Sequence, residues 1–152
     1  MKVSVVSGGF DPIHSGHIAY LNAAKEQGDI LIVALNSDAW LTNKKGQPFM
    51  SFEERKTILE NLSCVDEVMD FTDDELGSCI NALVAIKQKY PKEHIIFCNG
   101  GDRNDSNIPE MSVSGIEFKF SIGGEDKRNS SSWILKNWQG DSEDRVWGKF
   151  FN

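Results

Sequence analysis

The stretch GGFDPIHSGH, residues 8–17, gives the clearest indication of the fold. It follows residues 3–7, a short apolar and β-branched run that is typical of a strand. It leads into residues 15–27, where Ile18, Leu21 and Ala24 recur at helical spacing and Gly28 supplies a stop. A strand, a glycine turn and a helix in this order predict the first unit of an alternating α/β fold.

The same alternation continues along the chain. Residues 30–35 form a continuous apolar run, which is typical of a strand buried on both faces. Further strands are predicted at 65–71, 95–98 and 116–122, helices at 51–62, 72–90 and 130–138, and polar loops at 36–49 and 99–115. Repeated units of this kind predict a single-domain, Rossmann-like, doubly wound parallel five-stranded sheet with helices on both faces. We expect a domain over residues 1–138 and a C-terminal tail over 139–152.

Two of these helices have explicit start signals. Ser51 followed by Glu54 is a capping-box pattern, and residues 72–75 read as the cap of a helix that Pro91 ends. Four apolar residues of that second helix are expected to face the core: Leu76, Ile80, Leu83 and Val84.

Composition excludes several classes of protein. The chain has 152 residues, with 16 basic and 23 acidic residues and a net charge of −7, the wrong sign for a generic nucleic-acid binder. The longest clean apolar run, 30–35, is far shorter than the roughly 20 residues of a membrane helix. Three widely spaced cysteines are typical of reduced thiols. We therefore expect a cytoplasmic protein with no nucleic-acid or membrane partner.

The unusual polar sequences all follow predicted strands. They are residues 8–11, 36–38, 99–103 and 126–132. Because the carboxyl ends of parallel strands share one edge of the sheet, these loops are expected to converge into one binding site.

Residues 8–17 carry the sharpest chemistry of that edge. Gly8 and Gly9 would let the backbone approach a ligand, and the following helix points its positive end at the same place, which suits phosphate. His14 and His17 can donate hydrogen bonds to a phosphoryl group. A metal site or a pair of ordinary cap histidines are the alternatives. The i, i+3 spacing without a glutamate differs from the H-E-x-x-H pattern of metalloproteases.

These residues resemble the signature of the cytidylyltransferase-like nucleotidyltransferases, with its HxGH motif. The similarity extends through LNSDA (35–39), Lys44, SFEERKTIL (51–59), VDEV (65–68), NGGDR (99–103) and the serines at 130–132. The chain looks most similar to glycerol-3-phosphate cytidylyltransferases and heptose-phosphate adenylyltransferase domains. HxGH alone is shared with class I aminoacyl-tRNA synthetases, which are much longer.

The resemblance implies a reaction. CMP or AMP would pass from CTP or ATP to a phosphorylated polyol or sugar phosphate, with release of pyrophosphate. His14, His17 and Lys44 would contact the phosphates, and Lys45 is a weaker candidate. Mg²⁺ would bind through the nucleoside triphosphate, without protein ligands. By analogy, a homodimer is expected.

Further site residues are expected around this centre. Gly8, Gly9, Phe10, Asp11, Gly101 and Asp102 are candidates for nucleotide contact, as are Ser130, Ser131 and Ser132, for which simple capping is the alternative. Asp38 is a candidate for substrate binding or for ordering its loop. Arg55 extends the apolar stripe of Ile58 and Leu59, so it needs an anion. That anion is either a structural carboxylate or a ligand phosphate, and the resemblance favours the phosphate.

Two features leave the function open. Lys127, Arg128 and Asn129 stand before the three serines, where the family has a small or apolar stretch, so base choice is not fixed. Trp147, Phe150 and Phe151 in the tail are expected to pack on the domain or on a sister subunit. The rival hypothesis is a non-catalytic nucleotide-binding module on the same fold. A flavodoxin- or receiver-like domain would leave the HxGH pair and Arg55 without a purpose.

Overall fold

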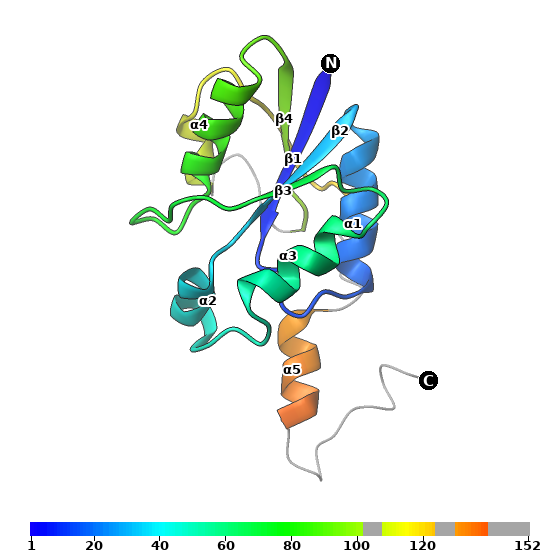
Figure 1. Ribbon diagram of the computed structural model, residues 1–152, viewed down its shortest axis with the longest axis vertical. Coiled ribbons are helices and arrows are strands. Elements are labelled where there is room, and N and C mark those ends of the chain that lie inside the picture. Colours follow the sequence, from blue (N-terminus) through cyan, green and yellow to red (C-terminus); the bar gives the residue numbers. More distant parts are fainter. Residues whose placement is uncertain (102–107, 124–129, 140–152) are drawn as a thin grey trace.

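Five parallel strands form one sheet in the order β3-β2-β1-β4-β5 (Figure 1). The computed structural model describes residues 1–101, 108–123 and 130–139. The strands are β1 (Lys2–Gly8), β2 (Ile30–Leu35), β3 (Glu67–Met69), β4 (His94–Cys98) and β5 (Glu117–Lys119). The chain builds outward from β1 to β3 and then crosses to β4 on the other side. The topological switch point therefore lies between β1 and β4, as predicted for a doubly wound sheet.

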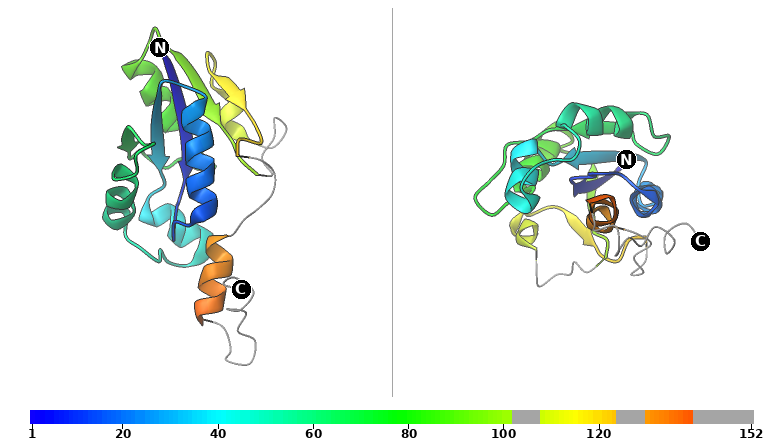
Figure 2. Two further views of the ribbon diagram at one scale, coloured as in Figure 1. Left: turned by 90° about the vertical axis from the view of Figure 1, so that its right-hand side faces the viewer. Right: turned by 90° about the horizontal axis from the view of Figure 1, so that it is seen from below.

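Helices cover both faces of the sheet (Figure 2). They are α1 (Ser15–Glu26), α2 (Asp38–Lys45), α3 (Phe52–Glu60), α4 (Ile80–Lys89) and α5 (Ser131–Gln139), with a 3₁₀ turn η1 (Pro109–Ser112). α1 and α3 bury Leu21, Ala24 and Leu59 against one face, and α4 buries Leu83 and Ile86 against the other. The alternation of side chains along each strand feeds both cores, because Val5 faces α4 and Val6 faces α1.

The predicted loop at 36–49 is wrong, because it contains α2. The Ser37 side chain accepts a hydrogen bond from the Trp40 N–H at 3.0 Å and starts the helix. Gly46 ends it with a φ of 95°, a left-handed conformation that glycine adopts without penalty. Leu41 supplies the buried contact, and its side chain lies over Gly9. One buried leucine in eight residues gives too weak a periodic signal for sequence reasoning.

The helix predicted from residue 72 begins only at Ile80. The Asp74 carboxylate accepts hydrogen bonds from the N–H groups of Leu76 and Ser78, so it closes a local turn instead of capping a helix. Leu76 is 71% exposed and Val84 is 41% exposed, so neither belongs to the core, whereas Leu83 is fully buried. The predicted strands at 65–71 and 116–122 are real, but they shorten to three residues each.

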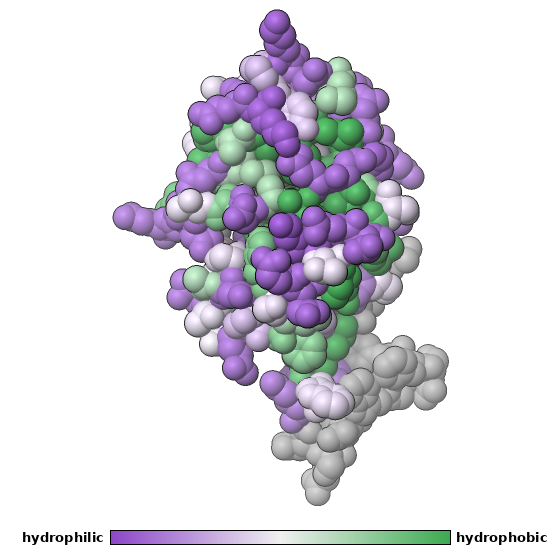
Figure 3. Space-filling model, in the orientation of Figure 1, coloured by the Kyte–Doolittle hydropathy of each residue, from purple (hydrophilic) through white to green (hydrophobic). Residues whose placement is uncertain are grey.

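The remaining predicted strands and helices are present, whereas the predicted loop at 99–115 contains η1. β2 has the predicted bounds, and Ser51 caps α3 by accepting from the Glu54 N–H. Figure 3 shows that hydrophilic side chains dominate the face formed by α2, α3 and α4, in keeping with the net charge. Within the described ranges, no helix is both long enough and apolar enough to cross a bilayer. The tail from residue 140 onward lies outside the described residues.

We expect Gly28→Ala to lower the melting temperature, because the turn after α1 packs against β1. A Cβ atom at residue 28 would lie 2.6 Å from Ser4 Oγ and 3.0 Å from the Lys2 carbonyl oxygen. Overpacking of this kind costs about 1–3 kcal/mol. Thermal unfolding followed by circular dichroism measures the change. The control is Asn22→Ala on the exposed side of α1, and an equal melting temperature for the two variants would contradict the prediction.

Candidate functional site

His14 and His17 stack on each other where α1 begins at the carboxyl edge of the sheet. Their ring centroids lie 3.9 Å apart with 26° between the ring planes. His14 is the N-cap of α1, and its Nδ1 accepts from the Gly16 N–H at 3.1 Å. His17 Nδ1 in turn accepts from the His14 N–H at 3.3 Å. The structure therefore brings the predicted pair together. The two histidines also cap α1 reciprocally, and these capping hydrogen bonds hold the pair in place.

This arrangement sets the protonation of both rings. A ring nitrogen that accepts a hydrogen bond carries no proton, so the neutral form of each ring has its proton on Nε2. Burial, followed by the positive charges of the neighbouring His14 and Lys44, lowers the pKa of His17 from 6.5 to about 3. His17 is therefore neutral at pH 7 and has an Nε2–H with which to donate.

The glycines before the pair serve close packing of the protein itself. A Cβ on Gly8 would lie 2.9 Å from the Phe10 ring, and one on Gly9 would lie 2.8 Å from Leu41. Phe10 is buried with a φ of 51°, and its ring meets the edge of His17 at a centroid distance of 4.8 Å. The contacts with Phe10 and Leu41 are sufficient to explain a glycine at both positions, and the approach of a ligand to their backbone stays a prediction.

Asp11 is buried and binds the segment between α2 and α3. Its carboxylate accepts from the N–H groups of Phe49 at 2.6 Å and Met50 at 2.7 Å. Lys45 Nζ forms an ion pair with it at 2.8 Å. Both carboxylate oxygens thus have protein partners, so the structure shows Asp11 holding a loop.

The two lysines at the end of α2 have different surroundings. Lys45 is held by Asp11, whose carbonyl oxygen also accepts from Lys45 Nζ at 2.6 Å. Lys44 Nζ lies over the Trp40 ring, 4.9 Å from its centroid, and its charge is felt by His17. Lys44 therefore lies within electrostatic reach of the histidine pair, as a phosphate-binding role requires.

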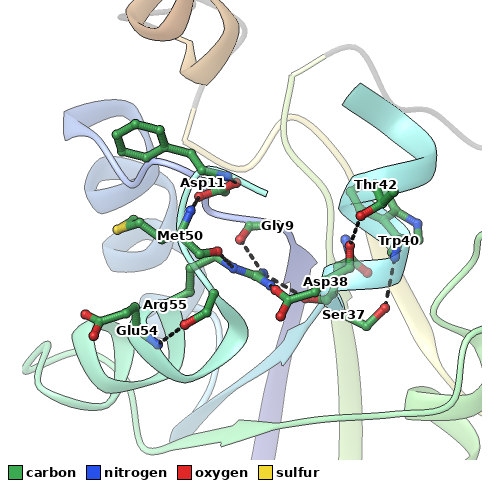
Figure 4. A network of polar contacts seen from close by, with 12 residues as sticks. Gly9, Asp11, Ser37, Asp38, Trp40, Thr42, Met50, Glu54 and Arg55 are labelled. Atoms are coloured by element: carbon green, nitrogen blue, oxygen red, sulfur yellow. Dashed lines mark hydrogen bonds and ion pairs between the residues drawn. The ribbon is translucent and has the colours of Figure 1, made fainter. Parts of the chain in front are cut away.

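Arg55 joins four parts of the chain at the same edge (Figure 4). Its side chain is fully buried, and its guanidinium donates to the carbonyl oxygens of Gly9 and Asn36 through Nη1 and of Met50 through Nε. Nη2 donates to the Asp38 carboxylate at 2.7 Å. Of the two anions considered for Arg55, the structure shows the structural carboxylate. Asp38 likewise orders its loop.

The serines at the start of α5 lie beside the histidine segment. Ser131 Oγ donates to the Pro12 carbonyl oxygen at 2.8 Å, which places the N-terminus of α5 next to residues 12–14. Ser130 is a buried cap that accepts from the Trp133 N–H at 3.0 Å, and it lies 3.1 Å from Ser132 Oγ. The simple capping alternative therefore describes Ser130.

Other predicted residues are placed only in part. Gly101 has a φ of 61°, the left-handed conformation that favours glycine. Asp102 lies outside the described residues, as do Lys127, Arg128 and Asn129. Among the residues that the structure does describe, no three of the His, Cys, Asp and Glu side chains gather to hold a metal ion.

Sequence reasoning missed two aromatic residues that shape the site. Tyr20 of α1 donates from its hydroxyl to the Cys98 carbonyl oxygen at 2.5 Å and packs against Gly100. Trp40 donates from Nε1 to the Gly77 carbonyl oxygen at 2.9 Å and lies under Lys44. The two hydrogen bonds, from Tyr20 to Cys98 and from Trp40 to Gly77, join residues far apart in the chain, so no local spacing indicates them.

The chain belongs to the cytidylyltransferase-like family, whose model matches residues 5–116. The bifunctional protein HldE of Pelobacter propionicus is 38% identical over 125 residues, which cover 81% of this chain and 23% of that protein. The chain spans only about a fifth of the length of the curated relatives it matches.

Solved structures share the fold. The lipopolysaccharide core biosynthesis protein of Thermoplasma volcanium has a TM-score of 0.63 at 23% identity, covering 83% of this chain and 98% of that one. A bifunctional NMN adenylyltransferase/ADP ribose pyrophosphatase of Francisella tularensis, complexed with AMP and a manganese ion, also has a TM-score of 0.63. It is 17% identical, and the match covers 92% of this chain and 42% of that chain.

Replacing Arg55 with Met should destabilise the fold strongly. The change removes the arginine donor from the buried Asn36 carbonyl and from the partly buried Gly9 and Met50 carbonyls, and it leaves the Asp38 carboxylate without its cation. The Asp38 side chain is 46% exposed, so water solvates its charge, and the loss comes mainly from the carbonyl oxygens, at about 1–3 kcal/mol for each one left buried and unpaired. Urea unfolding measures the loss. Glu60→Gln, on the exposed side of α3, is the control, and a cost below about 1 kcal/mol for the arginine variant would show that the network contributes little.

The stability contributed by His17 should depend on pH. Its pKa is 6.5 in the unfolded chain and about 3 in the folded one, so the unfolded chain binds the proton first as pH falls. The contribution is full above pH 6.5 and declines from there toward pH 3. His17→Gln should therefore be most destabilised relative to the wild type near pH 8, and the gap should narrow by pH 5. Urea unfolding at both pH values measures it, and a constant gap would refute the shift.

Proposed function

We propose that this protein is a nucleotidyltransferase that transfers CMP or AMP from CTP or ATP to a phosphorylated polyol or sugar phosphate. The observation that carries the proposal is the stacked pair of His14 and His17 at the start of α1. Each Nδ1 is occupied by a backbone N–H, so the neutral rings have Nε2–H groups with which to donate to phosphate oxygens. The positive end of α1 adds to this preference for an anion.

The reaction is an in-line displacement. A phosphate oxygen of the acceptor forms a bond to the α-phosphorus of the nucleotide. The bond from that phosphorus to the bridging oxygen breaks, and pyrophosphate leaves with the electron pair. Protein catalysis of such a step consists of positioning and charge stabilisation, which needs no covalent intermediate.

The chain's residues divide into two groups in this reaction. His14, His17 and Lys44 would contact phosphates and stabilise the charge that develops on them. Arg55 and Asp11 would act indirectly, because their polar groups are hydrogen-bonded to the loops that carry or surround the histidine pair. We therefore assign Arg55 and Asp11 to positioning, in place of the phosphate and nucleotide contacts that the sequence predicts for them.

The start of α5 is the second phosphate-binding candidate. Ser131 is bonded to Pro12, so the N–H groups of the first turn of α5 are expected to lie close to the histidine pair. Ser132 would add a hydroxyl to the same phosphates.

A divalent cation is expected to enter with the nucleotide. The described residues present no cluster of ligands for it, and the Asp11 carboxylate is bonded to Phe49, Met50 and Lys45. Mg²⁺ suits this mode because it keeps several waters and is often bound through substrate phosphates, whose charge it neutralises. A homodimer and a cytoplasmic location stay predictions.

We expect His14→Asn to lower the rate of pyrophosphate release by about 10²–10³-fold, the effect of removing one donor from a developing charge. Asparagine is a favoured N-cap residue, so the start of α1 is preserved while the Nε2–H donor is lost. The assay contains Mg²⁺, one nucleoside triphosphate and a phosphorylated alcohol or sugar. A melting-shift panel of CTP, ATP, GTP and UTP identifies the nucleotide beforehand.

His94→Asn is the matched control, because His94 begins β4 at the opposite edge of the sheet and is 53% exposed. Lys44→Ala and Lys45→Ala compare the two lysines in the same assay, and the larger rate loss is expected for Lys44. Wild-type turnover in the His14 variant would remove its assigned role. Nucleotide binding without turnover for any acceptor would favour the non-catalytic module.

A further inference from the structure

The indole ring of Trp40, on α2, is held at both of its ends. Nε1 donates to the Gly77 carbonyl oxygen at 2.9 Å. The other end lies beside the loop after β1, because a Cβ atom on Gly9 would be 3.6 Å from Trp40 Cζ3. A ring that is hydrogen-bonded at one edge and packed at the other has little freedom to turn, so Trp40 presents a defined aromatic face at the carboxyl edge of the sheet.

The helix that carries this ring is itself tied down at its start (Figure 4). Ser37 Oγ caps α2 by accepting from the Trp40 N–H, and it donates to the Asp73 carboxylate at 2.6 Å. Asp38, the first residue of α2, pairs with Arg55, which also donates to the loop after β1. Trp40 therefore has a fixed position relative to the loop that carries the histidine pair.

Lys44 lies one helical turn after Trp40, on the same face of α2. Its Nζ is 4.9 Å from the centroid of the Trp40 ring, within the range of a cation–π contact. The charge of Lys44 also contributes to the lowered pKa of His17, so the ammonium group lies within electrostatic reach of the histidine pair. The Trp40 ring thus supports a cation beside the groups that would contact phosphate.

The two adjacent lysines at the end of α2 are held by different chemistry. Lys45 Nζ forms an ion pair at 2.8 Å with the buried Asp11 carboxylate, which offsets its charge locally. An aromatic face attracts a cation through its quadrupole and has no net charge, so the Trp40 contact holds the Lys44 ammonium without neutralising it. Restricting a long side chain in advance also lowers the entropic cost of binding an anion.

We propose that Trp40 is a positioning residue that holds Lys44 beside the histidine pair, ready to bind the anionic phosphates of the nucleotide. The inference rests on the proposed function, because Lys44 contacts phosphate there, and it adds that an aromatic ring at residue 40 is needed for that contact.

A double-mutant cycle tests the coupling between Trp40 and Lys44. The variants are Trp40→Leu, Lys44→Ala and the two combined. The probe is inorganic triphosphate with Mg²⁺, which has the anionic tail of a nucleotide without base or ribose, and its Kd is measured by titration calorimetry. With Trp40 present, Lys44→Ala should raise the Kd about 10-fold, the effect of losing one charge-assisted contact. In the Trp40→Leu background the same change should raise it by less than about 3-fold, because Lys44 is no longer held in place.

Two further variants sharpen the comparison. Trp40→Phe keeps an aromatic ring for Lys44 but lacks the Nε1–H that binds Gly77, so its Kd should be closer to the wild-type value than that of Trp40→Leu. Lys45→Ala is the matched control, because it removes the same charge from the adjacent residue, whose partner is Asp11. Its effect on the Kd should be the same with and without Trp40.

An equal cost of Lys44→Ala in the two backgrounds overturns the inference, and so does a wild type whose affinity for triphosphate is independent of Lys44. A Trp40 variant that only loosened the fold would melt at a lower temperature, with the cost of Lys44→Ala unchanged. The proposed function fails separately, when the wild type binds triphosphate but releases no pyrophosphate from any nucleoside triphosphate and acceptor.

Discussion

The buried guanidinium of Arg55 is the constraint on which the carboxyl edge depends. A charge taken out of water is costly unless it is paired and fully hydrogen-bonded. Here the donors of one side chain reach the loop after β1, the residue after β2, the start of α2 and the loop before α3. Because one rigid planar group serves all four, these loops cannot shift independently. The Asp11 carboxylate is a buried anion with a similar role. It forms an ion pair with Lys45 and accepts hydrogen bonds from the N–H groups of Phe49 and Met50.

The histidine pair shows how one set of bonds serves both the fold and the site. The reciprocal caps start α1, and they also orient both rings and fix which nitrogen has the proton. Burial and the charge of Lys44 keep His17 neutral near pH 7. An anion placed against the pair would act in the opposite direction on the pKa and favour protonation, so phosphate binding and proton uptake are linked at this position.

The sequence predicts the arrangement of the sheet better than the local roles of its residues. β1, β2 and α1 follow from apolar periodicity and from glycine stops, and the parallel order follows from the repetition of such units. α2 was not predicted because a single buried leucine produces no hydrophobic periodicity. The turn at Asp74 was predicted as a helix cap because turns and caps use the same hydrogen bonds from backbone N–H groups to an aspartate side chain. Gly9 illustrates the remaining limit: its identity is explained by Leu41, which a helix not visible in the sequence brings over it.

The groups around the histidine pair share one electrostatic preference. On the α1 face, two imidazole rings, Lys44 and the first turns of α1 and α5 all favour negative charge. The hydrogen bond from Ser131 to the Pro12 carbonyl oxygen joins α5 to the segment before α1, so donors from two distant parts of the chain are held in a fixed arrangement. An anion bound among them would be oriented by that arrangement, and positioning of this kind is what an in-line transfer requires.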